Sequence, residues 1–185
     1  MNKKVTNHPN ISVYAIILII IVALMAVFAL YRNLVRKPAV KTPQSIENTQ
    51  TLPVGWHKVD NGTGLSLKLQ KDSKEAVIPT IVLLETSLPE GTLIGNYIDT
   101  LKAGAVSTIP HLNFTSDDSS ENNGFRIYRL TAGYVVNRHP VNLIQRIYSK
   151  ESKIYIFTAS YLKDSKNTTE SEINGLLDTL SKDNL

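Results

Sequence analysis

Cysteine is absent from the 185-residue sequence, which excludes disulfide bonds, thiolate metal sites and cysteine nucleophiles. The sequence also lacks any catalytic or nucleotide-binding motif. Its four histidines are isolated, and none is paired with another at the spacing of metal ligands. The polar run from Ser116 to Glu121 lacks the alternating ligand order and the central glycine of a calcium-binding loop. We therefore expect no metal, no cofactor and no enzymatic activity.

An excess of charge of one sign is also missing from most of the chain, although the whole sequence has a net charge of +4 and a pI near 9.2. Six of the twenty basic residues and one of the sixteen acidic residues precede Val54, which leaves 14 basic against 15 acidic residues from there onward. The basicity therefore belongs to the N-terminal region, and we do not expect a nucleic-acid partner.

One long hydrophobic run begins at Ile11 and ends at Tyr31. It holds 21 residues without a charge. As a helix it would be roughly 31 Å long, close to the thickness of the hydrocarbon core of a bilayer. We expect residues 1–10 to form a tail and residues 11–31 to form an uncleaved transmembrane helix in contact with the lipid bilayer. A cleavable signal peptide is the alternative, because Val27 and Ala29 have the spacing that a peptidase reads.

The orientation of this helix rests on a near-balance of flanking cations. Lys and Arg residues are slightly more frequent on its C-terminal side, which by itself favours a cytoplasmic C-terminal part. A short N-terminal anchor that precedes a large domain more often starts translocation. We therefore expect a single-pass cell-membrane protein whose soluble domain is extracytoplasmic.

The chain after the anchor divides into a linker and one domain. Residues 32–53 contain Pro38, Pro43 and Pro53 among mostly polar residues and predict a flexible linker, which leaves residues 54–185 for a soluble domain. Alternating apolar residues predict a hairpin over 55–69 and a strand over 77–86 that contains Pro79. A helical period follows over 92–105. A short strand over 112–115, a polar connection over 116–123, and meander strands over 125–136, 141–148 and 154–161 come next.

The last predicted element is a helix with a marked start. Thr169 is the expected cap and Glu172 follows three residues later, before an apolar stripe that includes Leu176 and Leu177. The order hairpin, strand, helix, meander, helix predicts an α+β domain: an α-β-α sandwich with an antiparallel sheet.

The apolar pattern around this order matches a known family. Its parts are residues 88–101 (LPEGTLIGNYIDTL), Phe114, residues 124–130 (GFRIYRL), residues 154–160 (IYIFTAS), and Ile173, Leu176 and Leu177 in the last helix. Over about residues 55–180 the chain resembles the PsbP-like superfamily, including the bacterial DcrB-like domains. The resemblance implies an α-β-α fold used as a non-catalytic module, often exported and membrane-attached, that binds or supports partner proteins. It transfers no functional residues, because the matching positions are core positions.

A possible partner surface lies on the meander strands. Alternation places Arg126, Tyr128 and Tyr134 on the face opposite Arg129, and Arg146 lies on the adjacent strand. If this face is outward, its tyrosine and arginine side chains suit a protein contact, since both are common interface anchors. The simpler alternative is that these long side chains only cover an exposed sheet.

The expected function is a membrane-anchored, non-catalytic extracytoplasmic module that binds or stabilises a membrane-associated protein. The alternative is a small-ligand or lipid carrier with a pocket between sheet and helix near Trp56 and Tyr97. An enzyme is the least favoured reading. It would require His57, or the pair Asp117 and Asp118, to converge with other polar groups in a cleft.

Overall fold

The computed structural model describes residues 52–60 and 64–185. The predicted tail, the predicted transmembrane helix and all but the last two residues of the predicted linker lie outside these ranges, so their interpretation stays a prediction. Within the described ranges, neither helix combines the length and the apolar composition that crossing a bilayer requires.

Within residues 52–60 and 64–185, a single antiparallel sheet of seven strands forms the centre of the fold, in the order β1-β2-β3-β7-β6-β5-β4. The predicted hairpin is confirmed as β1 paired with β2, and the predicted meander as β5, β6 and β7. The strands span Trp56–Lys58 (β1), Leu67–Lys71 (β2), Thr80–Ser87 (β3), Asn113–Asn122 (β4), Phe125–Val136 (β5), His139–Lys150 (β6) and Lys153–Leu162 (β7).

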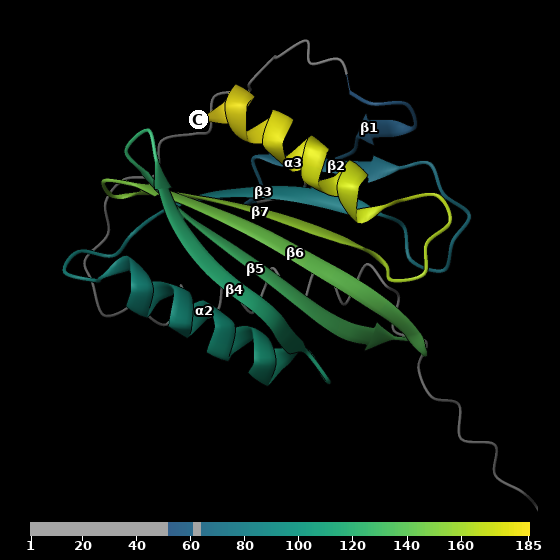
Figure 1. The fold of residues 1–185 in the computed structure, drawn as a ribbon, viewed down its shortest axis with the longest axis horizontal. Helices are drawn as coiled ribbons and strands as arrows, with labels where there is room; N and C mark the ends of the chain where they lie inside the picture. Colours follow the sequence, from purple (N-terminus) through teal and green to yellow (C-terminus); the bar gives the residue numbers. More distant parts are fainter. Residues whose placement is uncertain (1–51, 61–63) are drawn as a thin grey trace, which may run out of the picture.

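One helix covers each face of this sheet (Figure 1). Helix α2 (Ile94–Thr108) lies against one face, and helix α3 (Glu170–Asn184) lies against the other. We call these the α2 face and the α3 face. The predicted α-β-α sandwich with an antiparallel sheet is therefore confirmed.

The core is divided by the sheet. On the α3 face, Ile173, Leu177 and Leu180 of α3 are fully buried against side chains that include Phe157. On the α2 face, Ile94 and Ile98 of α2 pack on a cluster that includes Ile147, Ile154 and Ile156. A third cluster around Ile109, Leu112 and Val136 fills the α2 face near the C-terminal end of that helix. Burial of these apolar side chains on both faces holds both helices to the sheet.

Two tight turns fix the register of strands β4, β5 and β6. Asn137 and Arg138 join β5 to β6 with φ angles of 49° and 70°, the left-handed conformation that a two-residue hairpin turn requires. Asn123 and Gly124 join β4 to β5 in the same way, with φ angles of 51° and 75°. The β5–β6 turn places Val136 opposite His139, and every other cross-strand pair along these two strands follows from it.

The polar connection predicted over residues 116–123 is wrong. Except at a register shift between Phe114 and Ser116, β4 pairs with β5 along its whole length, so residues 116–122 are strand. These residues are polar because β4 is an edge strand that is exposed along most of its length. The strand predicted from Val77 also begins later, at Thr80, because Pro79 has no N–H to donate to a ladder.

Candidate partner-binding surface

The four residues of the predicted partner surface do not lie together. Arg126, Tyr128 and Tyr134 do share one face, as alternation predicts, but α2 covers much of that face. Tyr128 is half-buried beside α2, and Tyr134 is buried in the core. Arg126 alone of these three is exposed, and Arg146 lies on the opposite face. The four side chains therefore form no common surface.

The pKa of Tyr134 reflects its burial. Its burial raises the pKa of the phenol to about 12, against the smaller lowering effect of a hydrogen bond with Ser160. A tyrosine in this environment stabilises the α2 face and is not available to a partner.

The register of the sheet places more basic side chains on the α3 face than on the α2 face. On the α3 face the strands carry six basic and two acidic side chains, whereas on the α2 face they carry two of each, with histidines left out of both counts. Helix α3 brings acidic side chains to the basic face. Lys71 and Arg146 are paired with its Glu172 and Asp178. The strands therefore carry an excess of positive charge on the α3 face, part of which α3 neutralises.

Arg146 lies where α3 crosses β6, with only 10 % of its side chain exposed. Its Nη1 is ion-paired with Asp178, and its Nη2 donates to Asn174 Oδ1 at 2.9 Å. Both acceptors belong to α3. These contacts offset the cost of removing a guanidinium from water, because a buried charge must be paired and hydrogen-bonded.

Arg129 lies directly opposite Arg146 on the neighbouring strand β5. Its Nη1 donates to Ser120 Oγ at 2.9 Å and lies 3.5 Å from Asp118 Oδ1, both on β4. Like charges directly opposite each other on a ladder are unfavourable, so each guanidinium has its own carboxylate. Alternation along β5 had predicted Arg129 on the face opposite the candidate surface. The two-residue turn at Asn137 and Arg138 was the signal that sets 129 opposite 146.

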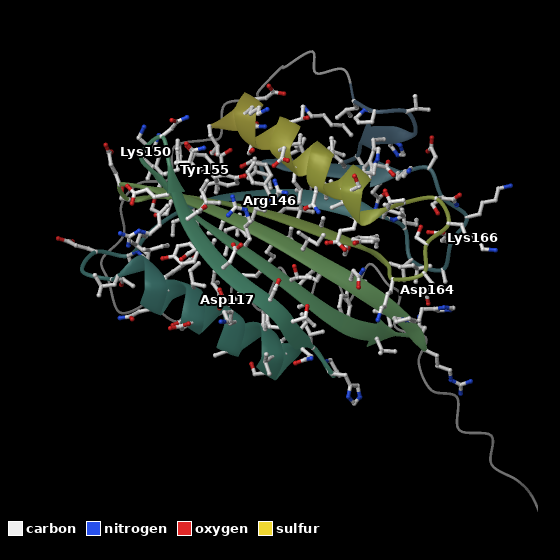
Figure 2. The ribbon with its side chains drawn as sticks, in the orientation of Figure 1. Asp117, Arg146, Lys150, Tyr155, Asp164 and Lys166 are labelled. Atoms are coloured by element: carbon white, nitrogen blue, oxygen red, sulfur yellow. The ribbon has the colours of Figure 1, made fainter. Side chains whose placement is uncertain are left out.

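Two lysines extend the same face toward the β6–β7 turn. Lys150 and Lys153 are opposite each other at the end of that ladder, and both are exposed. Neither is ion-paired with a carboxylate of residues 52–60 or 64–185. Lys150 Nζ lies 5.0 Å from the centre of the Phe125 ring, a cation–π contact. Figure 2 shows Arg146, Tyr155 and Lys150 in a row that leads from beneath α3 toward this turn.

We define the basic strip as Arg129, Arg146, Lys150 and Lys153. Aromatic side chains of the same face lie between and beside its two ends. Tyr148 is buried and makes edge-on ring contacts with Phe125 at 6.4 Å and Phe157 at 5.8 Å between centroids. Phe125 and Tyr155 are half-buried. Three exposed cations, the mostly buried Arg146 and the partly exposed rings of Phe125 and Tyr155 therefore lie on one face of the sheet.

The polar groups considered for catalysis or calcium do not converge. Asp117 and Asp118 point to opposite faces of β4, where they pair with Lys102 and Arg129. His57 Nδ1 lies 3.3 Å from Asp72 Oδ1 at the exposed β1–β2 end of the sheet. In the part of the chain that the structure describes, no three His, Cys, Asp or Glu side chains are gathered as metal ligands would be.

The pocket expected near Trp56 and Tyr97 is contradicted by the fold. Trp56 belongs to the core under α3, whereas Tyr97 belongs to α2 and packs on the other face of the sheet. The sheet lies between them, so no single pocket can be lined by both residues.

Comparison with known proteins identifies the fold. No protein-family model matches the chain, and no curated protein matches it in sequence. Among solved structures, cyanobacterial PsbP (CyanoP) from Synechocystis matches with a TM-score of 0.52 and 14% identity, over 69% of this chain and 81% of that chain. The fold is PsbP-like. LpqN, involved in cell envelope biogenesis of Mycobacterium tuberculosis, matches with a TM-score of 0.51 and 14% identity, over 66% of this chain and 75% of that chain.

The PsbP-like resemblance expected from the apolar pattern is therefore confirmed for the fold. At 14% identity these likenesses concern the fold alone. The DcrB-like assignment stays a prediction.

Proposed function

We propose that this protein is a membrane-anchored, non-catalytic extracytoplasmic module that binds or stabilises a membrane-associated protein partner. The observation that carries the proposal is the basic strip, in which arginine and lysine side chains lie beside half-buried aromatic rings on one face of the sheet. Arginine and aromatic side chains dominate the energetics of protein interfaces.

The arrangement suits binding better than chemistry. Arg146 is held by two acceptors of α3 and Arg129 by two acceptors of β4, so both guanidinium groups are fixed before a partner arrives. A fixed side chain loses less conformational freedom on binding than a mobile one. Part of the binding surface is therefore preorganised.

The proposed anchor and linker define where the partner is met. A flexible linker of the 22 residues 32–53 has a root-mean-square span of roughly 25 Å, about the diameter of a small domain. Tethering over this distance raises the effective concentration of the domain toward proteins of the same membrane. A cell-envelope role, as described for LpqN, is compatible with such a tether.

Cross-linking in intact membranes tests the proposal. The full chain, expressed at native level, is cross-linked before solubilisation and isolated under denaturing conditions. We expect one dominant membrane-associated partner. We also expect its yield to fall when Arg129→Gln and Lys150→Gln are combined, but not in the matched control Lys68→Gln with Arg126→Gln, which removes the same charge from the α2 face. A chain that remains monomeric and without a partner would contradict the proposal.

The side of the membrane is tested separately. In sealed, right-side-out vesicles we expect added protease to digest residues 54–185 without detergent. Digestion only after permeabilisation would place the domain in the cytoplasm and contradict the extracytoplasmic part of the proposal.

A further inference from the structure

We propose that the basic strip binds an extended, acidic segment of the partner, with carboxylate side chains four residues apart. This inference rests on the proposed function and specifies the chemistry of the partner. Charge complementarity along the α3 face supports it.

The strip has two cationic ends with an apolar floor between them. Arg129 and Arg146 are opposite each other on β5 and β6, and Lys150 and Lys153 are opposite each other on β6 and β7. Arg146 and Lys150 share strand β6 and one face, four residues apart, so their Cα atoms are about 13 Å from each other. The aromatic ring of Tyr148 lies between them on the same strand.

The side-chain spacing of an extended peptide matches the spacing of the two ends of the strip. Its side chains at positions i and i+4 point to one side and are also about 13 Å apart. Carboxylates at those two positions meet the arginine end and the lysine end of the strip together. Carboxylates at i and i+3 point to opposite sides of an extended chain, and only one of them can reach the strip.

The arginine end of the strip can accept a further carboxylate through Arg129. The carboxylates that now hold the arginines are largely solvated, because the side chains of Asp118 and Asp178 are 68 % and 59 % exposed. Arg129 itself is 44 % exposed. An arginine has five N–H donors in a planar fork, so a partner carboxylate can add to the existing contacts without removing them.

Other occupants fit the strip less well. Arginine recognises the planar carboxylate with paired hydrogen bonds, and the half-buried rings of Phe125 and Tyr155 suit a polypeptide more than a hydrated headgroup. A polybasic patch that binds lipid works mainly at the anionic cytoplasmic leaflet, whereas the proposed function places this domain outside.

The test measures peptide binding to the full chain in neutral-lipid nanodiscs by fluorescence anisotropy. The probes are labelled ten-residue Ser/Thr peptides with two glutamates at i and i+4, the same peptide with glutamates at i and i+3, and one with glutamines at i and i+4. We expect the i, i+4 glutamate peptide to bind at least about fivefold more tightly than the other two, with an affinity that falls as salt rises.

Variants connect the binding to the strip. Lys150→Gln combined with Lys153→Gln is expected to weaken binding about three- to tenfold, because two exposed ion pairs are lost. Arg129→Gln is expected to act in the same direction. The matched control Lys68→Gln with Arg126→Gln leaves the affinity unchanged. The lysines are exposed at a turn, so their replacement keeps the test valid even if Arg129→Gln fails to fold.

Three results would overturn the inference. The first is equal binding of the glutamate and glutamine peptides, and the second is an equal loss of peptide affinity in the control variant. The third is seen in nanodiscs with phosphatidylglycerol: loss of peptide binding together with protection of Lys150 and Lys153 from acetylation. The last result would assign the strip to the lipid surface. A result against the proposed function is distinct from these three. It is the absence of any cross-linked partner, whether or not the peptides bind.

Discussion

Glu172 joins the first turn of α3 to the β1–β2 hairpin. Its Oε1 accepts a hydrogen bond from the indole Nε1 of Trp56 at 2.8 Å. Lys71 Nζ donates to both carboxylate oxygens, at 2.7 and 2.8 Å. The side chains of Lys71 and Glu172 are only 13 % and 27 % exposed. One carboxylate therefore connects three elements, and its removal leaves a mostly buried ammonium group without its charge partner.

The pKa of Glu172 determines how this contact depends on pH. Burial alone raises the pKa, but the hydrogen bonds from Lys71 and Trp56 and the charge of Lys71 outweigh burial, so the pKa lies below the ordinary 4.5. A carboxyl with a lowered folded-state pKa stabilises the fold fully above its unfolded-state value. This stabilisation is lost as the pH falls from about 4.5 through the lower folded-state pKa.

We predict that Glu172→Gln lowers the free energy of unfolding by about 1–2 kcal/mol at pH 7. Hydrogen bonds to charged groups contribute about 1.5–3 kcal/mol, and partial exposure reduces that figure. For a domain of this size the loss corresponds to a decrease in Tm of roughly 3–8 °C. The variant should also lose part of the acid destabilisation of the wild type, because its side chain has no proton to gain in that range.

The assay is urea unfolding of the full chain in detergent, followed by the fluorescence of Trp56, the only tryptophan. Glu170→Gln is the control, since it removes the same charge from an exposed position in the same helical turn. It should cost less than about 1 kcal/mol, the usual effect of a charge near a helix terminus. Equal stability of Glu172→Gln and wild type at pH 7, or equal losses in both variants, would refute the reasoning.

Three further predictions concern the core and the anchor. Leu177→Ala should lower the free energy of unfolding by about 2–5 kcal/mol in the same urea assay, because a fully buried leucine of α3 leaves a cavity. Tyr134→Phe should remove part of the alkaline destabilisation. The raised phenol pKa stabilises the fold below pH 10, and this stabilisation is lost as the pH rises toward 12. Unfolding measured as a function of pH checks this prediction. Deletion of residues 1–31 should move the chain from the membrane pellet to the soluble fraction after carbonate extraction. Retention in the pellet would contradict the predicted anchor.

Elements with a strong apolar period could be predicted from the sequence. Thr169 caps α3 as expected, with the Glu172 N–H donating to its Oγ1 at 3.2 Å. The apolar stripe of that helix is buried, and β5 has the predicted bounds Phe125–Val136. In these segments local sequence and tertiary packing favour the same structure, so the local pattern was sufficient.

The remainder depends on contacts between distant segments. Residues 116–122 have a composition typical of a loop, yet they form a strand because β5 supplies a ladder for their backbone groups. Tyr134 was placed on the correct side of β5, but the sequence does not tell which helix covers that side. Glu172 was predicted only as a capping residue. Its contacts with Trp56 and Lys71 join residues 116 and 101 positions apart, beyond any local pattern.

The polar composition of β4 has a consequence for self-association. An open sheet has two edge strands whose unpaired backbone groups can template another chain. Here one edge, β1, is only three residues long, and the other, β4, carries three carboxylates and no cation. A second copy that approached β4 edge to edge would bring carboxylates toward carboxylates. This repulsion opposes growth of the sheet from β4, a property of value to a domain that a tether would hold at high local concentration.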